Sequence, residues 1–329
     1  MLTVEVAGVN RVRILKSSYL LVILAVLSVI SLFIGVSDLN LISLIRGESS
    51  HVQILVLSRI PRLMAIIITG MGMSVSGLIM QQLSRNKFVA PSTSATIDSA
   101  KLGVLVSMVL FPGAKALGKM SIAASFAFLG TFLFMALLKR IKIKNAIFIP
   151  LIGIMLGSII DSVTTFFAYR FDMIQNVSSF LMGNFSMVIQ GRYELLYLSI
   201  PMMILAMLYA KKFTIAGMGE EFATNLGLNY NTVVNIGLGI VSVISALSII
   251  TVGRIPFIGL VVPNIVSLYY GDNLEHSLGT TAVLGSVFLL VCDIIGRVII
   301  YPYEISIGLT VGVIGSFIFL LLLARRKTA

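Results

Sequence analysis

Long apolar runs separated by short polar connections fill almost the whole 329-residue chain, and charged residues gather at the ends of these runs. A helix needs about 20 apolar residues to cross roughly 30 Å of hydrocarbon, and lipid offers the backbone no other hydrogen-bond partners. The pattern therefore predicts an all-α polytopic membrane protein with a single transmembrane domain over residues 1–329. Its ten transmembrane helices are predicted at residues 18–36, 62–83, 95–111, 120–138, 146–168, 195–210, 232–252, 256–270, 278–300 and 306–324.

Composition agrees with this prediction, because the mean hydropathy is +1.05 and only 11% of the residues are charged. Such a chain has too few polar side chains to cover a water-facing surface. The first apolar run is too long for the core of a signal peptide, so we expect it to remain as the first span. Residues 175–189 are too short and too polar to cross, and they are predicted to form a re-entrant or interfacial segment.

The distribution of basic residues predicts the orientation. When the N-terminus is placed in the cytoplasm, most Lys and Arg residues fall in the inner connections, in agreement with the positive-inside rule. Both termini and residues 217–228 are then cytoplasmic. The net charge of +11 does not indicate a nucleic-acid-binding protein, because the basic residues flank apolar runs instead of forming one patch.

Side chains with catalytic or metal-binding chemistry are sparse. The single cysteine, Cys292, allows no internal disulfide, and His51 and His276 lie in separate connections. No group has metal-ligand spacing, so neither a metal site nor a catalytic site is predicted. Residues 113–119 read G-x-x-x-x-G-K like a phosphate-binding loop, but Met120 stands where a hydroxyl must bind Mg²⁺. Any ATP used with this protein must therefore be bound by another subunit.

Several charged residues lie within or near the predicted spans. Asp293 and Arg297 are four residues apart and are predicted to pair near the outer end of their helix. Asp98 and Lys101 are predicted to neutralise each other, with a substrate or ion site as the alternative. Asp161 has no evident neighbour in the sequence and is predicted to face a watery interior.

Two arginines, Arg59 and Arg62, mark the outer mouth of the second span. With Pro61 in the first turn, both guanidinium groups are predicted to lie on one side of the helix start. The spacing leaves two interpretations open. The arginines reach lipid headgroups, or they form a cationic feature for an acidic partner protein.

A polar interruption, "GMGEEFATNLGL" at residues 217–228, predicts a short cytoplasmic helix. Glu220 and Glu221 lie in its first turn, where carboxylates favour the positive end of the helix dipole, and Gly227 is placed to end it. An exposed apolar ridge needs a cover, which is either lipid or a partner protein. The predicted ridge consists of Phe222, Ala223 and Leu226.

Four segments in order resemble a known family: "SRIPRLMAIIITGMGMSVSGLIMQQLSRNKFVAPS", "GMGEEFATNLGL", "GRIPFIGLVVPNIVSLYYGDN" and "DIIGRVIIYPYEISIGLTVGVIGSFIFLLLLARR". They are similar to FecCD-type permeases of ABC importers for ferric siderophores, haem and vitamin B12. The resemblance implies a BtuC-like type II ABC importer permease fold with ten transmembrane helices. It also implies three kinds of partner: a second permease chain, two cytoplasmic ABC ATPases and an extracytoplasmic siderophore-binding protein.

The resemblance assigns roles to three groups of residues. The helix that couples to the ATPase is matched by Gly219, Glu220, Glu221, Phe222, Ala223, Leu226 and Gly227. Docking of the binding protein is matched by Arg59, Arg62 and Arg297. A translocation gate just before the fifth span is matched by Asn145, Ala146 and Ile147.

Departures from the family pattern narrow the expected cargo. Asn264 and Ser267 stand where relatives often have the His and Arg of a Pro-His-Ile-x-Arg run, so an arginine role is not carried over. Lys87 and Phe88 stand where many relatives have Pro-Leu. These details most resemble the branch that serves catecholate siderophores, including petrobactin-type and anguibactin-type systems. Members of that branch commonly pair two different permease chains, so we expect a heterodimer.

By this resemblance, the chain is expected to be a permease subunit of an ATP-driven ABC importer for a ferric siderophore in a bacterial cytoplasmic membrane. We expect a transport subunit and no enzyme, with ATP and Mg on the ATPases and Fe(III) only within the transported chelate. The alternative is a haem or vitamin B12 permease. The rival from another class is an ion-coupled secondary transporter that uses Asp98, Asp161 or Asp293 as proton carriers.

Overall fold

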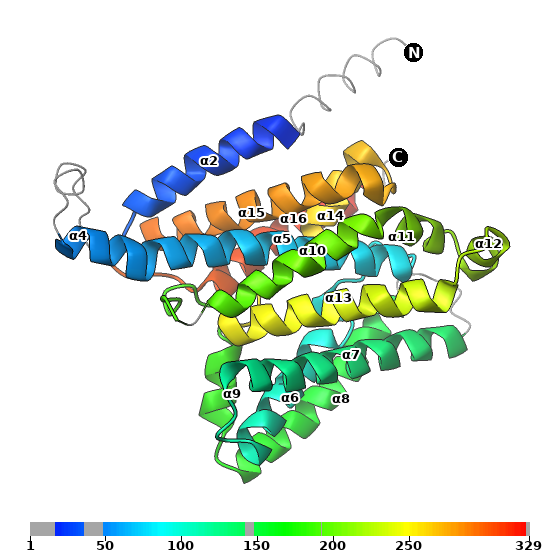
Figure 1. Cartoon of the computed structure of the whole chain (residues 1–329), viewed down its shortest axis with the longest axis horizontal. Helices are drawn as coiled ribbons and strands as arrows, with labels where there is room; N and C mark the ends of the chain where they lie inside the picture. Colours follow the sequence, from blue (N-terminus) through cyan, green and yellow to red (C-terminus); the bar gives the residue numbers. More distant parts are fainter. Residues whose placement is uncertain (1–16, 36–48, 142–147, 192, 327–329) are drawn as a thin grey trace.

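The structure is a computed structural model that describes residues 17–35, 49–141, 148–191 and 193–326. Helices make up almost all of this part of the chain (Figure 1). Extended pairing within these residues is limited to one isolated parallel bridge between Met182 and Arg254. The described chain is therefore an all-α structure.

The helices follow one another with short connections. In the first half they are α2 (Ser17–Phe33), α4 (Ser49–Ile54), η1 (Leu55–Arg59), α5 (Ile60–Leu83), η2 (Pro91–Thr93), α6 (Thr96–Leu110), α7 (Ala116–Arg140) and α8 (Phe148–Arg170). In the second half they are α9 (Ile174–Leu181), η3 (Glu194–Leu198), α10 (Ser199–Leu208), α11 (Ala210–Ala216), α12 (Glu220–Asn225), α13 (Tyr230–Thr251), α14 (Ile258–Tyr270), α15 (Leu274–Val298) and α16 (Ile307–Arg326). The π-helical turn η1 runs directly into α5.

Each predicted span overlaps a helix. Among the described helices, six are long and apolar enough to cross a membrane alone, and a bent pair, Glu194–Leu208 with Ala210–Ala216, makes a seventh if it crosses as one. The helices α2, α6 and α14 are shorter, with 17, 15 and 13 residues. The number of ten crossings therefore stays a prediction.

Helix α5 forms the centre of the molecule. It packs against α15, α13 and α14, and Figure 1 shows it running through the middle with α15 on one side and α13 on the other. Helices α6, α7 and α8 lie beyond α13, which contacts both α5 and α7. Helix α13 thus joins the two groups of helices.

Glycines in α5 allow its neighbours to approach the backbone. A Cβ atom on Gly77 would overlap the backbone of Gly259 in α14, and one on Gly70 would lie 2.7 Å from the Cα atom of Ser286 in α15. Lipid supplies little hydrophobic drive for helix association, so close packing through small residues contributes much of the attraction. The positions of α14 and α15 therefore depend on these glycines.

Replacing Gly77 with leucine should lower the free energy of unfolding by at least about 1–3 kcal/mol, because the side chain must displace the α14 backbone. The control is Gly239→Ala in α13, where a Cβ atom meets nothing within 4 Å. Thermal unfolding in detergent measures both variants. Equal melting temperatures would contradict the close contact between α5 and α14.

Candidate functional site

A sharp turn between α11 and α13 is filled by the short helix α12. Gly219 precedes this helix with a φ of 122°, and Gly227 follows it with a φ of 77°, values that L side chains rarely adopt. Glu220 and Glu221 lie in the first turn. The short helix predicted for residues 217–228 is present and projects from one end of the molecule (Figure 1).

Large apolar side chains stand out from this turn. Met218, Phe222 and Leu226 are each at least half exposed, and we call these three residues the α12 ridge. The prediction that Ala223 belongs to the ridge is wrong, because α12 packs this fully buried residue inward, toward α11 and α13. Met218 was missed because it precedes the helix, so helical periodicity could not include it.

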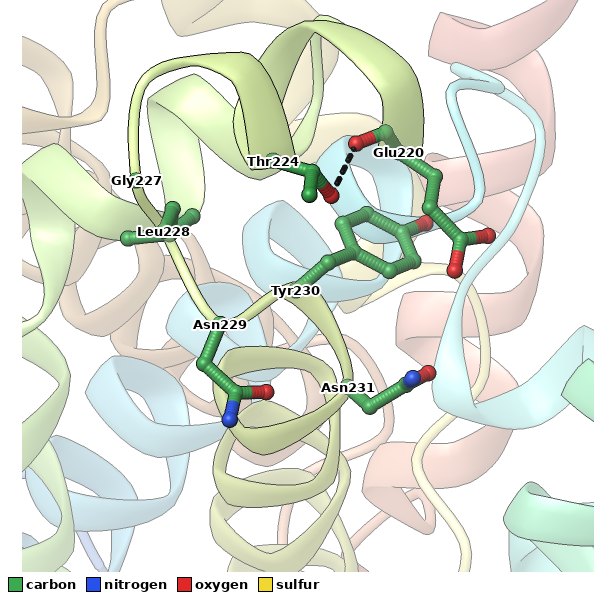
Figure 2. Close-up of a pocket in the computed structure, with 7 residues that line it drawn as sticks. All are labelled: Glu220, Thr224, Gly227, Leu228, Asn229, Tyr230 and Asn231. Atoms are coloured by element: carbon green, nitrogen blue, oxygen red, sulfur yellow. Dashed lines mark hydrogen bonds between the residues drawn. The ribbon is translucent and has the colours of Figure 1, made fainter.

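A hollow of about 500 Å³ opens beside α12 (Figure 2). Its lining consists of Glu220, Thr224, Gly227, Leu228, Asn229, Tyr230 and Asn231. The Thr224 hydroxyl donates to the Glu220 carbonyl at 2.8 Å, and the Asn229 side chain accepts from the Thr232 amide at 3.1 Å, which caps α13. Figure 2 shows the Tyr230 ring below α12 with its hydroxyl end toward Glu220. The first bond lies within α12 and the second within the start of α13, so each helix is ordered by its own bond where the two meet.

Five charged side chains gather at the opposite end of the molecule, and we call them the outer charge cluster: Arg59, Arg62, Asp293, Arg297 and Glu304. Asp293 lies between Arg62, at 2.8 Å, and Arg297, at 2.6 Å, and the side chains of Asp293 and Arg297 are each 3% exposed. Arg62 also pairs with Glu304 at 2.8 Å. The pairing of Asp293 with Arg297 predicted from their spacing is confirmed.

The same arginines hold the end of α2. Arg297 donates to the carbonyls of Ser31, at 2.9 Å, and Ile34, at 2.8 Å. Arg59 donates to the carbonyl of Leu32, at 3.1 Å, and to that of Ile34. Carbonyls at a helix C-terminus lack intrahelical partners and carry partial negative charge, which suits a guanidinium. The cluster therefore joins α2 to α5 and α15.

Burial bears on the arginines predicted to dock a binding protein. Arg59 and Arg297 are buried, and Arg62 is only slightly exposed. Because all three donate to groups of this chain, contact with another protein requires some of these bonds to open. Their docking role stays a prediction. Sequence reasoning missed Glu304 as a partner of Arg62, since the two residues lie 242 positions apart and no pattern connects them.

Glu304 is the most accessible carboxylate of the outer charge cluster, with 25% of its side chain exposed. It lies in the connection between α15 and α16. Burial alone would raise the pKa of Glu304, but the hydrogen bond from Ser186 and the charge of Arg62 together lower this pKa below its usual value. Glu304 is therefore held as an anion between Ser186 and Arg62.

A second group of charges lies among α6, α8 and the break between α13 and α14. Lys101 pairs with Asp161 at 2.6 Å, and Arg254 lies 3.9 Å from Asp98. The prediction that Asp98 and Lys101 neutralise each other is wrong, because each reaches a partner on another element. Asp161 likewise has the neighbour that the sequence did not reveal.

Two further predictions concern the translocation gate and the lack of a metal site. The predicted gate at Asn145, Ala146 and Ile147 lies outside the described residues. In the part of the chain that is described, no three or more His, Cys, Asp and Glu side chains are placed to hold a metal ion.

Residues 21–325 match the FecCD transport family. The chain belongs to the FecCD transport family. The petrobactin import system permease protein YclN of Bacillus subtilis (strain 168) is 59% identical over 313 residues, which cover 95% of this chain and 99% of that protein. The ferric-anguibactin transport system permease protein FatD of Vibrio anguillarum (strain ATCC 68554 / 775) is 40% identical over 299 residues, 91% of this chain and 95% of that protein.

A solved structure supports the architecture of this FecCD-family chain. A metal-chelate type ABC transporter in an inward-facing conformation superposes with a TM-score of 0.79 and covers 94% of this chain and 98% of its own. Its sequence identity is 20%, so it shows the fold alone. The predicted family and the predicted helical importer-permease fold are confirmed.

Removing the buried carboxylate of this FecCD-family chain should destabilise it strongly. Asp293→Asn leaves Arg62 and Arg297 without their shared counterion and should lower the free energy of unfolding by about 3–5 kcal/mol. The control is Glu275→Gln, which breaks an exposed pair with Lys211 and should cost less than about 1 kcal/mol. Equilibrium unfolding in detergent compares them, and equal losses would contradict the role given to Asp293.

The ion pair of Glu304 should make stability depend on pH. Because its pKa is lower in the folded than in the unfolded protein, the stabilisation is present above the unfolded value and is lost as pH falls through the folded value. The melting temperature of the wild type should therefore approach that of Glu304→Gln below about pH 4. A difference between the two melting temperatures that stays constant from about pH 7 to about pH 3 would contradict this.

Proposed function

We propose that this chain is the permease subunit of an ATP-driven ABC importer that carries a ferric siderophore of the catecholate class across a bacterial cytoplasmic membrane. The observation that carries the proposal is its likeness, over almost the full length of both chains, to permeases named for petrobactin import and ferric-anguibactin transport. At 59% identity over 313 residues, the likeness to the first of these permeases extends beyond the fold to more than half of the aligned residues.

The α12 ridge is the surface that meets the ATPase in this proposal. Three large apolar side chains on a polar, projecting turn expose more apolar surface than a solvated turn normally tolerates. A groove on a cytoplasmic ATPase would cover them. Because α12 packs on both α11 and α13, a movement of the ATPase would be passed to two helices of the bundle.

The remaining partners follow from the same proposal. A second permease chain, different from this one, completes the translocation path, and two cytoplasmic ABC ATPases drive it. A siderophore-binding protein docks at the extracytoplasmic end, where the outer charge cluster lies. Both termini are then cytoplasmic.

The chain acts as a transport subunit without an enzymatic step of its own. ATP and Mg bind to the ATPases, and Fe(III) passes through only as part of the chelate. The charges within the spans favour this proposal over an ion-coupled transporter, because Asp98, Asp161 and Asp293 each face a Lys or Arg side chain. A carboxylate that carries protons must become protonated in each transport cycle, and a nearby Lys or Arg charge opposes this protonation.

Transport in proteoliposomes tests the proposal. The permease, its partner permease, the ATPases and the binding protein are reconstituted, and accumulation of a ferric catecholate is measured. ATP-dependent uptake is expected. Uptake driven by a proton gradient without ATP would overturn the importer, and uptake of haem or vitamin B12 in place of the ferric catecholate would overturn the cargo.

Leu226→Asp should separate ATP hydrolysis from uptake, because a charge in the α12 ridge would have to be buried in the ATPase groove. We expect uptake to fall by about tenfold or more while the ATPases still hydrolyse ATP. The control is Asn231→Asp, which adds a negative charge at the same end of the molecule outside the ridge. Unchanged uptake by Leu226→Asp would remove the ridge from the ATPase contact.

A further inference from the structure

Four charged side chains meet inside the bundle, and we call them the mid-membrane cluster: Asp98, Lys101, Asp161 and Arg254. The Asp98 carboxylate lies against Gly157, near the middle of α8, a helix long enough to cross a membrane. Arg254 lies in the break between α13 and α14, and Gly259 just beyond this break lies against the α5 backbone. Asp98 therefore meets α8 near the middle of that helix, and Arg254 lies where α13 has ended and α14 has not yet begun.

The backbone around Arg254 leaves helical geometry at this depth. Gly253 and Phe257 have positive φ values of 93° and 61°, and the Arg254 carbonyl lies beside Gly183 and Gly308. Non-helical backbone inside a membrane is tolerated only where protein buries it or where it lines a water-filled cavity. Broken helices of this kind commonly form the binding sites of transporters.

The Arg254 guanidinium is held loosely. Its side chain is 45% exposed, its nearest carboxylate is Asp98 at 3.9 Å, and no group in the described parts of the chain accepts a hydrogen bond from it. The side chain of Asp161 is also 45% exposed. Charged groups that face lipid at this depth are costly, so this face must open on a polar path or on another protein.

We propose that Arg254 binds the anionic oxygens of the cargo as the cargo passes along this face. The inference rests on the proposed function, and it adds a cargo-contacting residue to it. A guanidinium presents five donors in a planar fork that matches paired oxygens, such as those of a carboxylate or a catecholate. Asp98 positions the fork without occupying its donors.

The balance of charges in the mid-membrane cluster makes this site weak. Two carboxylates offset two cations, so an anion gains the donors of Arg254 but also meets the negative charges of Asp98 and Asp161. Weak binding suits a translocation path, because cargo that enters a site must also leave it. Selection of the cargo then belongs to the binding protein, and Arg254 supplies a transient contact.

The complete transporter in proteoliposomes tests this site, with ferric catecholate uptake and ATP hydrolysis measured together. Arg254→Gln should reduce uptake about tenfold, while hydrolysis and binding-protein docking stay at the wild-type level. Arg254→Lys keeps the charge but not the fork and should recover part of the uptake. The control is Arg170→Gln, at the exposed end of α8, which should transport normally.

Two outcomes of this experiment would overturn the site. One is unchanged uptake by Arg254→Gln. The other is loss of assembly between the permease chains in both Arg254 variants, which would make Arg254 a contact between permeases. A wild-type transporter that carries no ferric catecholate would instead overturn the proposed function.

A binding measurement on the permease in nanodiscs, without the binding protein or ATP, tests the site independently of transport. The probes are the trianionic gallium tris-catecholate and an uncharged gallium tris-hydroxamate. The anion should bind wild-type permease, lose affinity as salt rises from about 50 mM to about 500 mM, and bind Arg254→Gln about tenfold more weakly. Equal binding of both probes, or equal binding of the anion to both proteins, overturns the site.

Discussion

A charge that enters hydrocarbon must find its counterion within the protein, and the Asp293 carboxylate is where this constraint shapes the structure most. It lies between Arg62 of α5 and Arg297 of α15, and its side chain is almost fully buried. With Asp293 in place, Arg297 is held where its remaining donors reach the last carbonyls of α2. One carboxylate thus joins the ends of α2, α5 and α15, although Arg297 lies 266 positions after Ser31 in the sequence.

The same constraint has a different result in the cluster of Asp98, Lys101, Asp161 and Arg254. In the outer charge cluster, Asp293 is enclosed and pairs with Arg62 and Arg297 at 2.6–2.8 Å, whereas Arg254 and Asp161 are half exposed and Arg254 lies 3.9 Å from its carboxylate. A tight, enclosed pair contributes rigidity, because removing either partner leaves a buried charge. A loosely held, exposed guanidinium contributes little rigidity, but its hydrogen-bond donors stay available to another molecule. The difference in burial therefore separates a structural cluster from one suited to transient contacts.

How much the sequence could predict depends on how far apart along the chain the interacting residues lie. Hydropathy and helical periodicity are local, so the positions of the helices and the pairing of Asp293 with Arg297 within one helix were predictable. Lys101 and Asp161, or Arg62 and Glu304, meet only after distant helices have packed, and no spacing in one sequence reveals such partners. Ala223 shows the same limit at a single residue. Helical periodicity predicted that Ala223 belongs to the apolar face of α12, but it could not predict that Ala223 is buried while Phe222 and Leu226 on the same face are exposed.

Helix α13 connects the α12 turn, which is proposed to contact the ATPase, with Arg254, which is proposed to contact the cargo. It begins at the α12 turn, where the Asn229 side chain accepts a hydrogen bond from the Thr232 amide, and it ends just before the break that holds Arg254. Because a helix is stiff along its axis, a displacement of α12 reaches the far end of α13 nearly undiminished. There the Arg254 guanidinium faces Asp98 of α6 across 3.9 Å. The loose pair between them is the contact that such a displacement would change first, since tighter pairs resist the same strain.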